Sequence, residues 1–184
     1  NFVSDTREQG FKDVMANEFP NVKIVAVEPT NFDTAQAQRI AETWLNTYPN
    51  LDAIAYISDS LGLAARSAAE AKGKQLIYAG YDGDVEMHPF IEDGSVLLDV
   101  LTGAERVGYW NIAAGARLAA GAEFPIDLYM PTHFVTSDAT AAALKEKGLE
   151  FNYLNPTQAL DVIKGYSQEM GPSVPDEVIS GEQQ

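Results

Sequence analysis

The stretch Ile77-Tyr78-Ala79-Gly80-Tyr81-Asp82-Gly83-Asp84 decides how the rest of the chain can fold. Residues 75–81 form a short apolar run that predicts a buried strand. Asp82-Gly83 is typical of a turn, and a helix-like segment follows it. In an open α/β sheet, ligands bind outside the carboxyl ends of the strands. Asp82 is therefore a candidate ligand-binding residue, and the alternative is that it only caps the next helix.

Strands and helices alternate on both sides of this stretch. Strands are predicted over 22–28, 51–57, 75–81 and 95–101, and helices over 5–18, 33–48, 61–72, 85–91 and 104–120. Asp33-Thr34-Ala35-Gln36 has the pattern of a capping box at the start of the second helix. The alternation predicts βαβ units and therefore an α/β fold, a three-layer parallel sheet with helices on both faces.

The pattern loosens after Gly121. Extended segments are predicted over 126–130 and 132–135, and helices over 138–147 and 157–169. Residues 171–184 contain two prolines, several acids and few large apolar side chains, which is typical of a flexible tail.

The composition limits the possible functions. The 184-residue chain has a formal net charge of −15 and only 12 lysine and arginine residues. Nucleic acids and anionic membranes both attract basic surfaces, so neither is expected as a partner. The absence of cysteine excludes disulfides, thiolate metal sites and cysteine nucleophiles. No apolar run is long enough to cross a bilayer, so direct membrane insertion is not expected.

Motifs for catalysis and for cofactors are absent or incomplete. The sequence has no G-x-S-x-G, no P-loop and no G-x-G-x-x-G. The acids at 82–86 resemble the start of an EF-hand loop, but Met87 occupies the position that requires glycine. His88 lies beside Pro89 and is expected at the surface or half-buried. The sequence therefore predicts a binding protein without a metal or cofactor, rather than an enzyme.

Polar and aromatic residues follow the predicted strands. In a parallel sheet, the loops 1–7, 29–33, 58–60 and 81–84, together with Thr102, lie on one rim. This rim combines a cation, an aromatic ring, hydroxyls and carboxylates. Charged groups form strong hydrogen bonds with hydroxyls, and a ring packs on an apolar sugar face, so the mixture fits a neutral polyhydroxyl ligand.

Two of these residues allow two interpretations. Arg7 lies in the first turn of a helix, where a cation opposes the macrodipole. Either Asp5 or Glu8 compensates for it locally, or Arg7 points into a site. Phe32 stands in a loop before a helix, where it either packs on that helix as a hydrophobic staple or remains exposed as a stacking platform.

Five short motifs then stand in the order and spacing found in the type I periplasmic sugar-binding proteins. They are Arg7-Glu8-Gln9-Gly10-Phe11, Asn31-Phe32-Asp33, Ser58-Asp59, Gly80-Tyr81-Asp82-Gly83 and Asp93-Gly94-Ser95. From about residue 4 to 135 the chain resembles this family, with the ribose-binding and galactose-binding proteins as the nearest relatives. The core of the lactose repressor shares the pattern.

The resemblance implies a substrate-binding component of an ABC importer, which binds a small sugar reversibly in a cleft between two lobes and docks on a permease. Such proteins are periplasmic, or extracellular and lipid-anchored in Gram-positive organisms. The alternative function is that of a sugar-sensing effector domain in a receptor or a lactose-repressor-like regulator.

The resemblance also implies which residues bind the sugar. The six candidates are Arg7, Phe32, Ser58, Asp59, Asp82 and Thr102. Arg7 and Asp82 correspond to residues that bond sugar hydroxyls, and Phe32 to an aromatic wall of the pocket. Ser58 and Thr102 are shorter than the asparagine and glutamine found in relatives. The shorter side chains leave room for a sugar other than ribose.

A division of the chain follows from the same resemblance. Residues 1–103 correspond to a second-lobe α/β domain, 104–136 to a cross-over segment belonging to the first lobe, 137–170 to a helical C-terminal extension and 171–184 to a flexible tail. Because the family has two similar lobes, we expect an incomplete lobe here, which pairs with a missing N-terminal half or with another copy of the chain.

Overall fold

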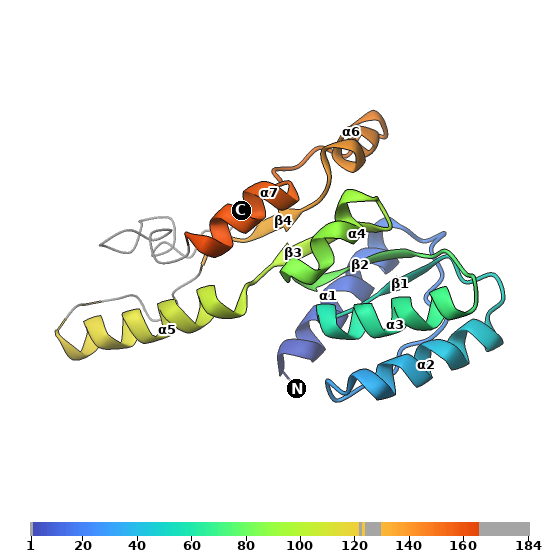
Figure 1. Cartoon of the computed structure of the whole chain (residues 1–184), viewed down its shortest axis with the longest axis horizontal. Coiled ribbons are helices and arrows are strands. Elements are labelled where there is room, and N and C mark those ends of the chain that lie inside the picture. The colour runs from blue at the N-terminus through green and yellow to red at the C-terminus, as the bar shows by residue number, and fades with distance from the viewer. Residues whose placement is uncertain (1, 122, 124–129, 166–184) are drawn as a thin grey trace. The chain divides into compact units, whose positions relative to one another are not determined.

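The computed structural model describes residues 2–121, 123 and 130–165 (Figure 1). Its helical elements are α1 (Phe2–Glu18), α2 (Thr34–Thr47), α3 (Asp59–Ala71), the 3-10 turn η1 (Val85–Met87), α4 (His88–Glu92), α5 (Ala104–Ala119), α6 (Asp138–Glu146) and α7 (Pro156–Lys164). The strands are β1 (Ala53–Ala55), β2 (Ile77–Asp82), β3 (Val96–Leu101) and β4 (His133–Val135).

The chain divides into two compact units, unit 1 (Asn1–Gly80) and unit 2 (Tyr81–Gln184). Each unit is described by itself below. The division does not test the assignment of residues to two lobes, which stays a prediction. The predicted tail at 171–184, the end of the predicted helix at 166–169 and most of the extended segment at 126–130 lie outside the described residues.

The four strands form one sheet in the order β1-β2-β3-β4. β1 and β2 are parallel, with Ile54 opposite Tyr78. β3 and β4 are antiparallel, with Val100 opposite Phe134. The α/β prediction is confirmed, and β4 is the exception to a wholly parallel sheet.

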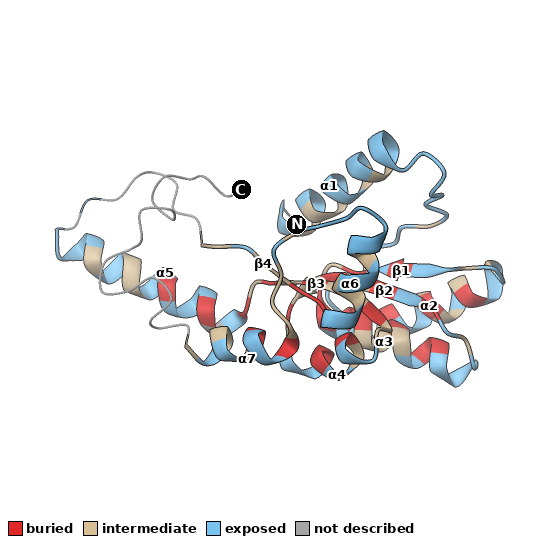
Figure 2. Ribbon diagram, turned by 90° about the horizontal axis from the view of Figure 1, so that it is seen from above, coloured by how far each residue is buried: buried red, intermediate tan, exposed pale blue. Residues whose placement is uncertain are grey.

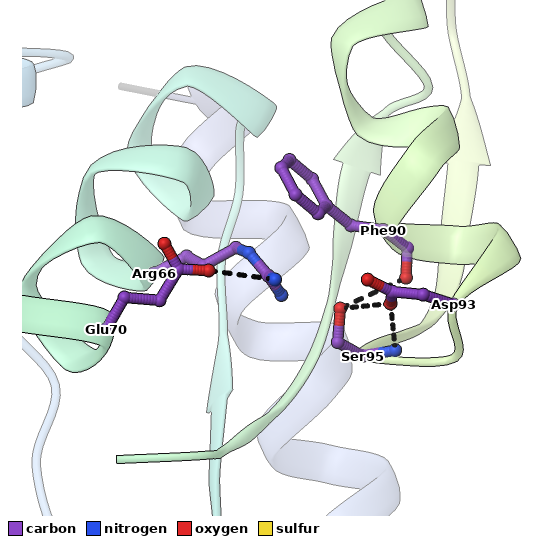
Figure 3. Close-up of polar contacts among 5 residues, drawn as sticks. All are labelled: Arg66, Glu70, Phe90, Asp93 and Ser95. Atoms are coloured by element: carbon purple, nitrogen blue, oxygen red, sulfur yellow. Dashed lines mark hydrogen bonds and ion pairs between the residues drawn. The ribbon is translucent and has the colours of Figure 1, made fainter. Parts of the chain in front are cut away.

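In unit 1, helices flank both sides of the strands. Figure 2 shows α1 on one side of β1 and β2, and α2 and α3 on the other. Helices α2 and α3 pack together through small and aliphatic side chains, among them the buried Ala41, Leu45 and Ala68. On α3, the largely buried Arg66 and the exposed Glu70 form an ion pair at 2.9 Å with the i, i+4 spacing of a helix (Figure 3).

A buried tyrosine ring explains two glycines of unit 1. A Cβ atom on Gly62 would lie 2.7 Å from the ring of Tyr56, and a Cβ atom on Gly80 would lie 2.0 Å from it. The ring therefore occupies the space that a side chain would need on α3 and on β2. Gly80 in the opening stretch is required by this packing, since any larger residue would displace Tyr56.

The prediction of a strand at 22–28 is wrong. This segment has no regular secondary structure, and within the described residues no strand pairs with it. Its side chains Val22, Ile24, Val25 and Val27 are all exposed by more than a third. The β-favouring sequence is present, but no strand in the described part of the chain lies beside it to complete its hydrogen bonds.

The predicted capping box of α2 is present by half. Asp33 accepts a hydrogen bond from the backbone N–H of Gln36 at 2.8 Å, as an N-cap residue does. The Gln36 side chain donates instead to the carbonyl oxygen of Pro29 at 3.2 Å. The start of α2 is therefore tied to the loop before it rather than closed on itself.

In unit 2, η1, α4 and β3 enclose an apolar core that contains Met87, Ile91, Val96 and Leu101. The turn from α4 into β3 follows the Asp93-Gly94-Ser95 motif. Asp93 Oδ1 accepts hydrogen bonds from the Ser95 backbone N–H at 2.8 Å and from Ser95 Oγ at 2.5 Å (Figure 3). Gly94 has φ 79, which a residue with a side chain rarely adopts. This motif therefore shapes a turn.

The helices near the end of the described chain agree with the predictions at their starts. Ser137 caps α6 by accepting from the Thr140 N–H at 3.0 Å. Asn155 and Gln158 form a full capping box at the start of α7. Among the residues with described structure, no helix is both long and apolar enough to span a bilayer.

Candidate functional site

The first group of candidate residues lies in unit 1, at the carboxyl end of β1. Arg7 reaches this end from α1, because its Nη1 donates a hydrogen bond to the carbonyl oxygen of Ile57 at 2.6 Å. Ser58 and Asp59 follow Ile57 directly in the chain. The structure therefore brings Arg7, Ser58 and Asp59 together at one strand end.

Ser58 and Asp59 begin helix α3. Ser58 is the N-cap residue, but its side chain makes no capping hydrogen bond. Its hydroxyl lies 3.4 Å from the hydroxyl of Ser60. Asp59 is fully buried in the first turn of the helix, where the macrodipole favours a negative charge. The Ser58 side chain is therefore buried at this strand end, with a hydroxyl that is not used for capping.

Phe32 stands just before α2, also in unit 1. Its side chain is 48% exposed. It follows Asn31, and both residues have left-handed backbone, with φ 51 for Asn31 and φ 59 for Phe32. The exposure favours the interpretation as a stacking platform over that of a staple packed on α2.

The second group lies in unit 2 and consists of Asp82 and Thr102. The backbone oxygen of Asp82 accepts hydrogen bonds from the N–H of Thr102 at 3.0 Å and from the N–H of Gly103 at 3.1 Å. Thr102 Oγ1 also donates to Asp82 Oδ1 at 3.3 Å. The following turn η1 has Asp84 as its N-cap residue. Asp82 is therefore held by Thr102, and the structure does not use it as the helix cap.

Backbone strain coincides with two candidate residues. In the described part of the chain, the residues other than glycine with positive φ are Asn31, Phe32 and Asp82, the last with φ 124. Such conformations cost roughly 1–3 kcal/mol each and persist where the surroundings impose them, often at ligand-binding sites. The sequence selects Phe32 and Asp82 for their side-chain chemistry. The backbone strain is a second, independent feature of the same two positions.

His88 differs from the prediction, because it is buried with only 7% of its surface exposed. Burial lowers the pKa of the His88 imidazole, while Glu92, a hydrogen bond with the Gly83 backbone and Glu86 act in the opposite direction. Its Nε2 atom has no hydrogen-bond partner. The hydrogen bond with the Gly83 backbone connects the His88 imidazole to the turn that follows Asp82.

Arg106 is a buried residue that sequence reasoning missed. It lies in the first turn of α5, and its guanidinium contacts the backbone oxygens of Leu101, Thr102 and Pro131. The available signal was the one that drew attention to Arg7, namely a cation in the first turn of a helix.

The chemistry of these groups is that of polar recognition. An arginine, carboxylates, hydroxyls and an exposed ring can bind hydroxyl groups and an apolar sugar face. Among the residues described, no group of three or more histidine and acidic side chains could hold a metal ion.

The sequence profile described as "Periplasmic binding protein domain" matches residues 1–123. The chain belongs to the periplasmic binding protein family. The match covers both groups of candidate residues, from Arg7 to Thr102.

Two curated relatives and one solved structure show how far the similarity extends. The chain is 32% identical over 117 residues to the D-ribose/D-allose-binding protein of Pseudomonas aeruginosa, covering 62% of this chain and 36% of that protein. It is 30% identical over 147 residues to the ribose operon repressor of Halalkalibacterium halodurans, covering 74% and 41%. An ABC transporter periplasmic solute-binding protein from Actinobacillus succinogenes, crystallised with D-allose, has a TM-score of 0.68 at 23% identity, covering 74% and 49%.

These similarities confirm three expectations in their general form. The fold is that of a type I periplasmic binding protein lobe. The import and binding proteins of the family are solute-binding proteins rather than enzymes, and they are periplasmic or extracellular. The chain spans less than half the length of each of the three proteins compared above, so the function of the whole protein is treated as a proposal.

Proposed function

We propose that the chain is part of the substrate-binding component of an ABC importer and binds a small sugar reversibly. The sugar would lie in a cleft between this lobe and a second one, and the loaded protein would dock on a membrane permease. It would act in the periplasm, or outside the cell on a lipid anchor. The second lobe would come from an N-terminal half or from another copy of the chain.

The observation that carries this proposal is the placement of Asp82. Its carboxylate lies at the carboxyl end of a parallel strand, where α/β proteins bind ligands, and its backbone is strained. Arg7, Ser58 and Asp59 stand at the equivalent end of β1, the strand parallel to β2. The names of relatives support a sugar in particular, since they include binding proteins for ribose, allose and apiose.

Calorimetry of the intact natural protein against pentoses, hexoses and polyols tests the proposal. Binding of at least one of these compounds is expected. Failure to bind any of them would contradict it. A survey of this kind also identifies the sugar. It includes compounds other than ribose because the short Ser58 and Thr102 side chains would leave room for them.

Two substitutions then test the site itself. Arg7→Ala and Asp82→Ala should each weaken sugar binding by about 2 kcal/mol or more, since each removes a charge-assisted hydrogen bond from a desolvated contact. Arg39→Ala and Asp52→Ala are matched controls, because both side chains are exposed and neither lies at the carboxyl end of a strand. Equal affinities in all four variants would make Arg7 and Asp82 structural residues only.

A second candidate function is that of a sugar-sensing effector domain. The similarity to the ribose operon repressor covers 74% of the chain, which is more than the other curated relatives above cover. In that case sugar binding would persist, but the intact protein would carry a basic DNA-binding segment and would bind DNA in a sugar-dependent way. A signal peptide on the intact protein would instead favour the importer.

A further inference from the structure

Arg106 is an unusual residue for its position. It occupies the first turn of α5, after the N-cap residue Gly103, and only 2% of its surface is exposed. A cation at a helix N-terminus opposes the macrodipole, and burial adds a desolvation cost. The macrodipole and the desolvation cost both disfavour an arginine here, so its contacts must compensate for them.

The contacts of Arg106 join two parts of unit 2 that are distant in sequence. Its Nη2 donates to the carbonyl oxygen of Pro131 at 2.6 Å, and its Nη1 lies 3.4 Å from the carbonyl oxygen of Thr102 and 3.5 Å from that of Leu101. Leu101 ends β3 and is paired with His133, which begins β4. Arg106 thus ties the end of β3 to the segment that leads into β4.

The same guanidinium is connected to Asp82 through a single residue. The backbone N–H and the hydroxyl of Thr102 both donate to Asp82, and the Thr102 carbonyl is the acceptor that Arg106 contacts. The backbone of Thr102 is therefore held by Asp82 through its N–H and by Arg106 through its carbonyl oxygen. Because Asp82 has a strained backbone, its carboxylate needs this support from outside its own strand.

We infer that Arg106 is a positioning residue, which fixes Thr102 and through it orients the Asp82 carboxylate toward a sugar hydroxyl. The inference rests on the proposed function and adds to it a residue outside the six candidates. Arginine suits this task because its planar guanidinium carries five donors and serves several carbonyl oxygens at once. A lysine ammonium is a compact point charge on a flexible stem and cannot reproduce this arrangement.

The experiment compares Arg106→Met and Arg106→Lys with Arg39→Met in the intact natural protein. Arg39 is an exposed arginine on α2, so the control makes the same chemical change at a site without these contacts. For a sugar bound by the wild type, we expect the dissociation constant to rise at least tenfold in Arg106→Met and less in Arg106→Lys. Arg39→Met should leave it unchanged. Wild-type affinity in both Arg106 variants would overturn the inference.

A double-mutant cycle separates positioning from general stabilisation. If Arg106 acts through Thr102, the effects of Arg106→Met and Thr102→Ala on the dissociation constant should be non-additive, because the Thr102 hydroxyl can orient the Asp82 carboxylate only while Arg106 holds the Thr102 backbone carbonyl in place. A purely structural arginine would lower the melting temperature and give additive effects on binding. Additivity within twofold would therefore also overturn the inference.

Hydrogen exchange gives a readout that needs no sugar. In Arg106→Lys the amides of Thr102 and Gly103, both bonded to Asp82, should exchange faster while amides in α2 and α3 keep their wild-type rates. Unchanged rates at Thr102 and Gly103 would overturn the inference, and so would failure of both Arg106 variants to fold. If the wild type binds no sugar but Arg106→Lys shows this local acceleration, the result would count against the proposed function and leave the connection from Arg106 to Asp82 intact.

Discussion

Residues 22–28 and strand β2 are similar in sequence and different in structure. Both are short runs rich in apolar and β-favouring residues, and both lead into a turn. β2 has β1 as a parallel neighbour, and its Tyr78 is buried. Residues 22–28 pair with no strand among the described residues, and their valines are exposed. The comparison shows that β propensity describes fit to a pleated, half-buried surface, and an apolar run becomes a strand only where such a surface exists.

Strand β2 and residues 22–28 are also held in place by different kinds of hydrogen bond. Backbone hydrogen bonds join β2 to β1, and side chains from α2 hold residues 22–28. Tyr48 Oη donates to the carbonyl oxygen of Val25 at 3.1 Å, and Trp44 Nε1 donates to Glu28 at 3.0 Å. Substitutions should therefore be costly in β2 and the sheet, and mild in residues 22–28.

The largest effect is expected at Gly80 in β2. Gly80→Ala places a methyl group 2.0 Å from the Tyr56 ring, so the ring or the strand must move. We expect the free energy of unfolding of the 184-residue chain to fall by about 3 kcal/mol, measured by chemical denaturation. Gly10→Ala in α1 is the control, since nothing lies within 4 Å of the added methyl. That change should raise the stability by about 0.5–1 kcal/mol, because alanine is the better helix former. A harmless Gly80→Ala would contradict the packing of Tyr56.

The next test applies one substitution to the sheet and to residues 22–28. Val96 begins β3 and is 0% exposed, whereas Val27 is 44% exposed. Val96→Thr buries a hydroxyl in an apolar site and should cost about 1–3 kcal/mol, while Val27→Thr should cost less than about 0.5 kcal/mol. Denaturation curves of the two variants measure the difference. Equal costs would mean that Val27 is as buried as a residue of the sheet.

The elements that local sequence determines were predicted well. Asp33 at the start of α2 and the alternation of strand and helix around β2 and β3 depend on neighbours in the chain, and both predictions are confirmed. The strand at 22–28 depended on a partner strand, and the pattern of the segment itself carries no information about one. The burial of His88 was missed for the same reason, since it results from tertiary packing of η1 and α4.

The candidate site was predictable in chemistry more than in geometry. Arg7 was selected as a misplaced helix cation, and the structure shows it at the end of β1. Arg106 carried the same signal and also follows a predicted strand, but its burial and its bond to the Pro131 carbonyl oxygen are tertiary features that the local sequence does not show. The positive φ values of Phe32 and Asp82 could not be predicted, since neither residue is glycine and only the surrounding structure imposes these angles. The binding roles of these residues stay predictions.

A pH-dependent effect is expected beyond β2, at His88. Its pKa is lowered in the folded state from the ordinary value of 6.5, chiefly by burial and against the charges of Glu92 and Glu86. The folded state therefore favours neutral imidazole, and this contribution is complete above pH 6.5 and declines as the pH falls below it. Wild-type stability should thus decrease more between pH 7.5 and 5.5 than that of His88→Gln, measured by chemical denaturation at a series of pH values. Parallel profiles would show that His88 is not buried as neutral imidazole.

The smallest effects should come from removing one hydroxyl in each region. Tyr48→Phe deletes the bond to Val25 that holds residues 22–28, and should cost about 0.5–1 kcal/mol. Tyr78→Phe in β2 deletes a buried hydroxyl that has no hydrogen-bond partner, and burial raises the pKa of this tyrosine to about 12. Because an unsatisfied buried hydroxyl only costs energy, the second change should be neutral or stabilising. Thermal and chemical denaturation compare the two variants. A larger loss in Tyr78→Phe than in Tyr48→Phe would reveal a hydrogen bond to a buried water at β2. It would also mean that the stability of β2 depends more on a side-chain hydroxyl than that of residues 22–28 does, which is the opposite of the expected order.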